Sequence, residues 1–244
     1  MNLIVDIGNS RVKLCLFSHN EIAHFQVIEF DDVDALHRFC HNQNIECGIV
    51  SSVVTINPDF LTAIKQLCSH KCLVLERETP LPIQNIYATP QTLGLDRIAA
   101  AVGVFSISPN KHSLIIDAGT AITIDYLNAD NQYVGGNISP GLNTRFKALN
   151  SFTNKLPLLD FKTPWQMIGD STETAIITGV QQGILFELEG YIDYFSQKYT
   201  DIQIFVTGGD AEFIHTYLQK KTQFEPMLVL KGLNRILYYN EFEK

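Results

Sequence analysis

The sequence predicts an α/β protein in which one structural design occurs twice. Short apolar segments with the alternation or β-branching of strands are interspersed with segments that have the helical period of apolar residues. Residues 3–17 and 113–127 share a further layout: an apolar strand, an aspartate, a turn with glycine and a hydroxyl residue, and a returning strand. Because these two segments lie almost half a chain apart, a duplicated domain with a boundary near residues 108–112 is the simplest interpretation.

The first half is expected to form a mixed sheet covered by helices. Helices are predicted for residues 33–39, which Asp31-Asp32 can cap, and for residues 58–68, which Pro58 can begin. The predicted strands are residues 3–5, 12–17, 21–30, 47–54 and 72–75. This order implies antiparallel hairpins first and parallel crossover connections afterwards.

A proline-rich connection separates these elements from the second half. Residues 79–90 have no clear period, and they lead to a small-residue helix at residues 98–105. After its hairpin, the second half is expected to contain a broken strand at residues 133–141 and a helix at residues 142–150. A long helix at residues 170–199 and a strand at residues 202–206 follow. The last strand ends at Thr207-Gly208-Gly209-Asp210, where a flat ring or a phosphate could lie against the backbone; a tight βα turn explains these residues equally well.

The composition describes an ordinary globular protein. The 244 residues are 45% hydrophobic and 18% charged, and no apolar run approaches the length of a membrane span. Because the start lacks the basic and apolar regions of a signal peptide, a cytoplasmic protein with no membrane partner is expected. A net charge of −8 without a cluster of Lys and Arg argues against a nucleic-acid partner. Five cysteines, an odd number, indicate reduced core thiols.

The turn after the first strand is the best candidate for a phosphate site. Gly8 allows close approach of the backbone, Asn9 and Ser10 can donate to anionic oxygens, and Lys13 adds a positive charge. Asp6 would face bound phosphates only through a cation, so its position predicts Mg²⁺. A hairpin whose Asn-Ser turn merely reverses the chain is the alternative.

Six short motifs together resemble those of a known family. They are Asp6-Ile7-Gly8-Asn9-Ser10, Tyr87 with Pro90, Leu93-Gly94-Leu95-Asp96-Arg97, Asp117-Ala118-Gly119-Thr120, Gly135-Gly136 with Pro140-Gly141, and Thr207-Gly208-Gly209-Asp210. Their order and spacing are similar to those of type III pantothenate kinases, within the actin, Hsp70 and sugar-kinase superfamily. The resemblance implies two duplicated actin-like (ribonuclease H-like) domains, residues 1–110 and 111–244, with mixed β-sheets flanked by helices and a cleft between them.

The same resemblance implies ATP-dependent phosphorylation of pantothenate to 4'-phosphopantothenate, the first step of coenzyme A biosynthesis. It also implies Mg²⁺ and a monovalent cation, K⁺ or NH₄⁺, with Asp117 as the monovalent-cation ligand and Asp96 as the proton acceptor. The matches to ATP contacts are Asp6, Ile7, Gly8, Asn9, Ser10, Arg11, Val12, Lys13 and Thr120. The matches to the pantothenate site are Tyr87, Gly94, Leu95, Asp96, Arg97 and Thr172. Ile98 follows Arg97 where the family often has an aromatic residue, a difference that concerns packing.

Physical chemistry supports the roles of Asp96 and Arg97. Phosphoryl transfer depends mainly on positioning and on neutralising charge, so a carboxylate that orients or deprotonates a hydroxyl suits Asp96. Arg97 can bind an oxyanion with two parallel hydrogen bonds. The same residues could instead form a solvated helix start, where the helix dipole favours a carboxylate.

Other functions share these features. A superfamily kinase or phosphatase for another small substrate would have the same fold, and a nucleotide-binding regulatory protein would have the same turns. An actin-like filament protein is a third alternative, although 244 residues are few for the insertions that filaments use. A homodimer is expected from the long apolar helix near residues 175–194 and from the dimers of the resembled family.

Overall fold

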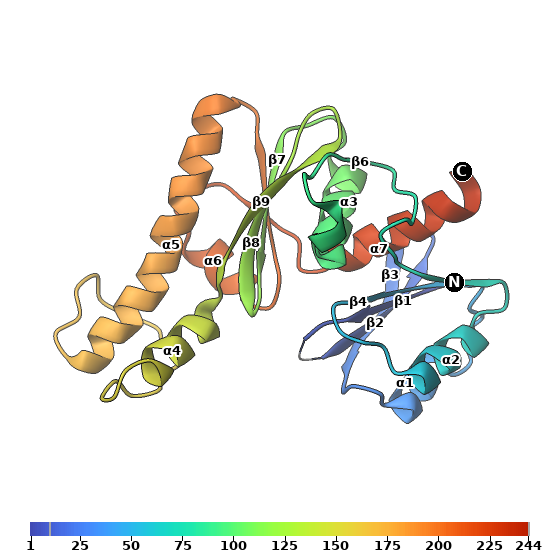
Figure 1. Cartoon of the computed structure of the whole chain (residues 1–244), viewed down its shortest axis with the longest axis horizontal. Helices are drawn as coiled ribbons and strands as arrows, with labels where there is room; N and C mark the ends of the chain where they lie inside the picture. The colour runs from blue at the N-terminus through green and yellow to red at the C-terminus, as the bar shows by residue number, and fades with distance from the viewer. Residues whose placement is uncertain (10, 244) are drawn as a thin grey trace. The chain divides into compact units, whose positions relative to one another are not determined.

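The computed structural model describes residues 1–9 and 11–243, which fall into two compact units. The first unit comprises Met1–Pro109, Asn131–Tyr133 and the segment that begins at Leu228. The second unit comprises Asn110–Asp130 and Val134–Met227. The expected second domain, residues 111–244, differs from the second unit because the segment from Leu228 onward packs within the first unit (Figure 1).

Five strands form the sheet of the first unit. In chain order they are β1 (Asn2–Ile7), β2 (Val12–Ser18), β3 (Glu21–Ile28), β4 (Cys47–Ser52) and β5 (Lys71–Val74). Their order across the sheet is β3-β2-β1-β4-β5. β1 is antiparallel to β2 and parallel to β4, which confirms the predicted change from hairpins to crossover connections. β1 is therefore the central strand, with a neighbour of each direction.

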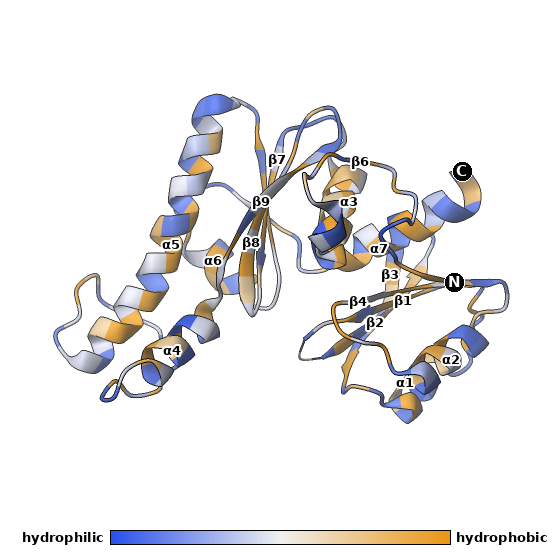
Figure 2. Ribbon diagram, viewed as in Figure 1, coloured by the Kyte–Doolittle hydropathy of each residue, from blue (hydrophilic) through white to orange (hydrophobic). Residues whose placement is uncertain are grey.

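Helices cover both faces of this sheet. α1 (Val33–Cys40) and α2 (Pro58–Leu67) share a core with the odd-numbered residues of β1, and hydrophilic and hydrophobic residues alternate around both helices (Figure 2). α3 (Leu95–Ile107) and α7 (Leu228–Tyr238) pack side by side, and both contact β4. Because side chains alternate along a strand, the even-numbered residues of β1 face α3 and α7. The 2.9 Å hydrogen bond from Asn2 Nδ2 to Asn234 Oδ1 of α7 agrees with this placement.

α3 and α7 approach each other closely at two glycines. A Cβ atom on Gly232 would lie 1.8 Å from the carbonyl oxygen of Ala99, and one on Gly103 would lie 2.4 Å from that of Leu228. Neither distance leaves room for a side chain. The expected closely packed helix at residues 98–105 is thus confirmed, whereas α7 has no counterpart among the predicted elements.

The connection before α3 is mostly irregular, as expected. It contains the two-residue strand β6 (Gln84–Asn85), which pairs in parallel with residues 132–133 of the same unit. The 3₁₀ helix η1 (Pro90–Thr92) follows, and the short π-helix η2 (Tyr239–Glu243) extends α7.

The sheet of the second unit repeats the plan of the first. Its strands are β7 (Ser113–Ala118), β8 (Ala121–Leu127), β9 (Gln132–Pro140), β10 (Gln203–Thr207) and β11 (Gln223–Phe224). They follow one another as β11-β10-β7-β8-β9, with β7 antiparallel to β8 and parallel to β10. β7 therefore has the same two kinds of neighbour as β1. The predicted fold class, a duplicated α/β fold with mixed sheets, is confirmed.

Three helices pack against one face of this sheet. They are α4 (Leu142–Ser151), α5 (Thr172–Lys198) and α6 (Ala211–Tyr217). α5 lies within the helix expected at residues 170–199, and a capping box begins it: the Ser171 hydroxyl accepts from the Thr174 amide, and the Thr174 hydroxyl accepts from the Ser171 amide. Among the described helices, none has both the length and the apolar character needed to cross a membrane.

None of the five cysteines forms a disulfide. Cys15, Cys40 and Cys47 are buried, and Cys68 and Cys72 are half-buried. Burial raises the pKa of Cys40 to about 11, so its thiol stays protonated at neutral pH. Within residues 1–9 and 11–243, no three side chains of His, Cys, Asp or Glu form a group that could hold a metal ion.

Candidate active site

The turn between β1 and β2 holds a buried carboxylate. The Gly8 amide donates to the Arg11 carbonyl over 3.1 Å and closes the turn. Asp6 stands opposite Lys13 on the neighbouring strand and is only 6% exposed. The Lys13 Nζ atom lies 3.6 Å from Asp6 Oδ2, beyond hydrogen-bond distance. The turn therefore combines a buried acid with a partly exposed ammonium group.

The electrostatic surroundings of Asp6 favour a cation. Burial raises the pKa of Asp6, the nearby ammonium of Lys13 lowers it, and the carboxylate of Asp96 raises it again. The net effect is a pKa above the ordinary value of 3.8, so Lys13 does not fully compensate the buried charge. A divalent cation with oxygen ligands would supply the missing positive charge.

The other residues predicted to contact ATP in this turn differ in accessibility. The side chains of Ile7 and Val12 are buried in the core, which leaves only their backbone groups for a ligand. Arg11 is exposed and forms an ion pair with Glu29. Asn9 is exposed, and Ser10 lies outside the described residues. The predicted phosphate turn thus presents backbone groups, Asn9 and Lys13 at its surface.

The start of α3 brings three predicted site residues together within the first unit. Asp96 lies in the first turn of α3, and its Oδ1 accepts from the Arg97 amide over 2.9 Å. Arg97 is only 7% exposed, and its guanidinium carbon lies 5.9 Å from the centre of the Tyr87 ring. The predicted pantothenate residues Tyr87, Asp96 and Arg97 therefore form one cluster, and the charge of Asp96 links it to Asp6.

The turn between β7 and β8 is built on Asp117. Across the hairpin Asp117 faces Thr123, and on the parallel strand it stands next to Thr207. The Thr123 Oγ1 atom is buried and has no hydrogen-bond partner within the described residues. Gly208 directly follows β10 and has a φ of +100°. A Cβ atom on Gly208 would lie 2.5 Å from Asp117 Oδ1. Glycine is required there because the backbone is left-handed and the carboxylate is adjacent.

Backbone hydrogen bonds fix the far side of this second turn. The Thr120 carbonyl accepts from the Gly141 amide over 3.0 Å and from the Thr144 hydroxyl over 2.7 Å. The Asp210 amide donates to the Ala118 carbonyl over 2.9 Å. Burial and the carboxylate of Asp160 raise the pKa of Asp210. The Thr207-Gly208-Gly209-Asp210 turn is thus attached to the Asp117 turn.

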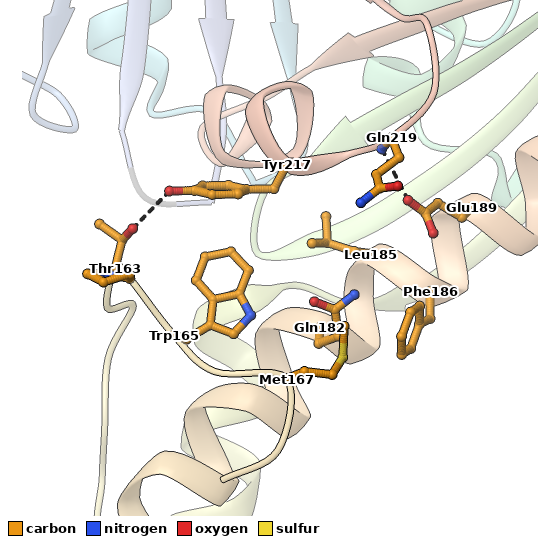
Figure 3. A pocket seen from close by; sticks show the side chains of 10 residues that line it. Thr163, Trp165, Met167, Gln182, Leu185, Phe186, Glu189, Tyr217 and Gln219 are labelled. Carbon is orange, nitrogen blue, oxygen red and sulfur yellow. Dashed lines mark hydrogen bonds between the residues drawn. The ribbon is translucent and has the colours of Figure 1, made fainter.

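Thr172, the last predicted pantothenate residue, begins α5 in the second unit. It is exposed and follows the Ser171 cap. A cavity of about 410 Å³ lies elsewhere on α5, lined by residues that include Trp165, Phe186 and Tyr217. Figure 3 shows the Tyr217 hydroxyl pointing to Thr163, with the Trp165 ring beside it. None of the predicted site residues that the structure describes lines this cavity.

Similarity to solved structures shows which fold the chain shares. The chain superposes on a proposed Baf family transcriptional activator from Campylobacter jejuni with a TM-score of 0.66, 23% identity and 98% of each chain covered. For a proposed 2-dehydro-3-deoxygalactonokinase from Sinorhizobium meliloti the TM-score is 0.64, with 11% identity, 99% of this chain and 100% of that chain. These identities show the fold alone. The chain therefore has the fold of these structures, which include proposed sugar kinases.

Sequence similarity identifies the family. The family model of type III pantothenate kinase matches residues 2–194. The type III pantothenate kinase of Phocaeicola vulgatus is 44% identical over 99% of both chains, and that of Bacteroides fragilis is 42% identical over 98% of both. The chain belongs to the type III pantothenate kinase family, a group of phosphotransferases. The resemblance found in the six sequence motifs is confirmed.

Proposed function

We propose that this protein transfers the γ-phosphoryl group of ATP to the hydroxyl of pantothenate, giving 4'-phosphopantothenate at the start of coenzyme A biosynthesis. Membership of the family over nearly the whole chain supports this reaction. The observation that carries the proposal is the convergence of Asp6, Asp96 and Arg97 within the first unit. Carboxylates and a guanidinium are the groups that phosphoryl transfer needs for positioning and charge neutralisation.

The cluster at the start of α3 is assigned to pantothenate. Asp96 orients the attacking hydroxyl and accepts its proton, while Arg97 binds an oxyanion, either the pantothenate carboxylate or the transferred group. The Tyr87 ring holds the Arg97 guanidinium in place from one side. Gly94, Leu95 and Thr172 complete the substrate contacts carried over from the family motif. The Asp6–Lys13 turn and Thr120 are assigned to ATP.

A kinase of this family uses ATP with a divalent metal, and Asp6 is the proposed protein ligand for Mg²⁺. The site suits a divalent cation because the Asp6 carboxylate is buried and its pKa stays raised despite the nearby ammonium of Lys13. Oxygen ligands suit Mg²⁺, which also keeps several waters when protein-bound. When bound, the ion neutralises charge on the ATP phosphates.

Asp117 is proposed to hold the monovalent cation, K⁺ or NH₄⁺. Such an ion needs one carboxylate at most and several neutral oxygens. The hydroxyl of Thr123 and the backbone of the Asp117–Thr120 turn are the available neutral groups. This donor set contains one carboxylate and no ammonium.

A homodimer in the cytoplasm is the proposed form of the protein. Phe186 and Tyr194 on α5 are 56% and 62% exposed, and aromatic side chains are enriched at protein interfaces. A second copy packing on α5 would bury them. Sedimentation at micromolar concentration tests this, and a fully active monomer would contradict it.

Mass detection of phosphopantothenate tests the reaction directly. Purified protein is incubated with ATP, Mg²⁺ and pantothenate, with and without K⁺ or NH₄⁺. Product should form only when ATP, Mg²⁺ and pantothenate are all present, and faster with the monovalent cation. Parallel reactions with other small hydroxylated substrates, and with ATP alone, examine the alternative kinases and phosphatases. No phosphopantothenate under any of these conditions would refute the proposal.

A further inference from the structure

Ser51, near the end of β4, carries a hydroxyl group that the described protein leaves unsatisfied. The residue is fully buried, and its Oγ atom has no hydrogen-bond partner in residues 1–9 and 11–243. Burying an unpaired hydroxyl is unfavourable, so buried polar groups nearly always have partners. A group that departs from this rule requires an explanation from function or from a ligand.

The sheet register places Ser51 next to Asp6. In the parallel pairing of β1 and β4, Ser51 is directly opposite Asp6, just as Lys13 is opposite Asp6 on the other side. Residues in register on adjacent strands project from the same face of a sheet. Val5, Ile7 and Val50 belong to the core under α1 and α2, so Asp6 and Ser51 project from the opposite face.

That opposite face is the one on which the candidate site lies. α3 packs against β4, and Asp96 in the first turn of α3 acts electrostatically on Asp6. The Ser51 hydroxyl thus shares its sheet face with the proposed Mg²⁺ ligand. It has no hydrogen-bond partner within the described residues, so its oxygen is available to a water molecule or another bound group.

Two other serines on strands differ from Ser51 in this respect. The Ser52 hydroxyl donates to the Val54 carbonyl over 2.6 Å and accepts from the Val54 amide over 3.1 Å. Ser113, which is also fully buried, donates to the Lys111 carbonyl over 3.4 Å. Both hydroxyls are satisfied by nearby backbone, as is usual for serine. Ser51 lies beside the buried carboxylate and lacks such a partner.

We propose that Ser51 is a positioning residue for the hydrated divalent cation of Mg·ATP. Its Oγ accepts a hydrogen bond from a water molecule of the cation's coordination shell, while Asp6 supplies the charged contact. Mg²⁺ retains several waters when bound to proteins, and each of these waters needs an acceptor in a buried site. The inference rests on the proposed placement of Mg²⁺ beside Asp6.

Calorimetric titration with ATP tests this without any catalytic turnover. Wild type, Ser51→Ala and Ser51→Cys are titrated at increasing Mg²⁺ concentrations, starting from none in the presence of EDTA. Ser51→Ala removes the acceptor, and Ser51→Cys leaves no cavity and has only a weak acceptor, so a cavity effect is separated from a hydrogen-bond effect. Ser113→Ala, a buried strand serine in the second unit, is the matched control.

Both Ser51 variants are expected to bind Mg·ATP about threefold to tenfold more weakly than wild type, with ATP binding in EDTA unchanged. Their melting temperatures should equal or exceed that of wild type, because an unpaired buried hydroxyl has been removed. Ser113→Ala should bind Mg·ATP normally. Wild-type affinity for Mg·ATP in the Ser51 variants, or an equal loss with and without Mg²⁺, would overturn the inference.

Asp6→Asn in the same titration keeps this inference distinguishable from the proposed function. If Asp6→Asn loses the Mg²⁺ dependence and the Ser51 variants keep it, only the role of Ser51 is refuted. If Asp6→Asn keeps the Mg²⁺ dependence, the placement of Mg²⁺ beside Asp6 fails, and the inference about Ser51 fails with it. Pantothenate is absent throughout, so the result does not depend on whether pantothenate is the phosphoryl acceptor.

Discussion

The two aspartate turns have the same backbone plan but differ in the residue that faces the aspartate across the hairpin. Asp6 faces Lys13, whose ammonium lies 3.6 Å away, whereas Asp117 faces Thr123, whose Oγ1 is buried without a partner in the described part of the chain. The first turn therefore carries a fixed positive charge, and the second offers neutral oxygens. A duplicated fold has given equivalent strand ends different electrostatic properties, which suit different cations.

The largest effect is expected at Asp96, whose carboxylate lies near the first turn. Asp96→Asn should lower the turnover number at least about a hundredfold, because the amide cannot accept the proton of the hydroxyl. ATP affinity by calorimetry and the response to K⁺ should be nearly unchanged. Asp34→Asn, an exposed carboxylate in the first turn of α1, is the matched control. Near-normal turnover would remove Asp96 from the mechanism.

Replacing either Asp117 or Asp6 with asparagine tests whether the two turns bind different cations. Asp117→Asn should weaken activation by K⁺ about tenfold, because a charged ligand of the cation becomes neutral. ATP binding should weaken with it. The response to Mg²⁺ should stay the same. Asp6→Asn should weaken the response to Mg²⁺ and leave the response to K⁺ unchanged. Initial rates are measured while one cation is varied and the other is saturating. If Asp117→Asn keeps the wild-type response to K⁺, the assignment of the second turn is wrong.

A lysine at position 123 would convert the second turn into a copy of the first. The tethered ammonium of Thr123→Lys should replace the monovalent cation, so that activity becomes independent of added K⁺ and NH₄⁺. Thr123→Val removes the oxygen without adding charge, so K⁺ and NH₄⁺ should activate this variant only weakly. Rates in buffers free of both ions compare the two variants. A lysine variant that still requires K⁺ would show that charge at this position is not the deciding property.

The smallest effect concerns folding rather than catalysis. The pKa of Asp6 is raised in the folded protein, so the folded state binds a proton more readily than the unfolded state. This contribution to stability is complete below the ordinary pKa of 3.8 and is lost as the pH rises through the raised value. Asp6→Asn should therefore melt at a slightly higher temperature at neutral pH without ligands. An equal fall in stability with rising pH in both proteins would contradict this.

The local parts of the site follow from the sequence, because short-range chemistry determines them. Strand, aspartate and turn are adjacent in the chain, so both hairpins are evident from residues 3–17 and 113–127. Ser171 as the cap of α5 is likewise a local property. These features need no knowledge of which segments meet in space.

The parts that were missed depend on contacts between distant segments. Ser51 gains significance only from its register with Asp6, which sequence spacing does not reveal. α7 is a short amphipathic helix like many others, and its place beside α3 depends on Gly103 and Gly232. A glycine pair in two helices indicates close packing only after the helices are known to be partners.

The return of α7 to the first unit has a consequence for biosynthesis. The ribosome makes β1 through α3 first, then the whole second unit, and only then the helix that covers α3. At about 5–20 residues per second, the apolar surface of α3 waits roughly ten seconds for its partner. During that interval the nascent first unit exposes a surface that chaperones recognise and that can misassemble. A premature stop before Leu228 would therefore damage the part of the protein that is synthesised earliest.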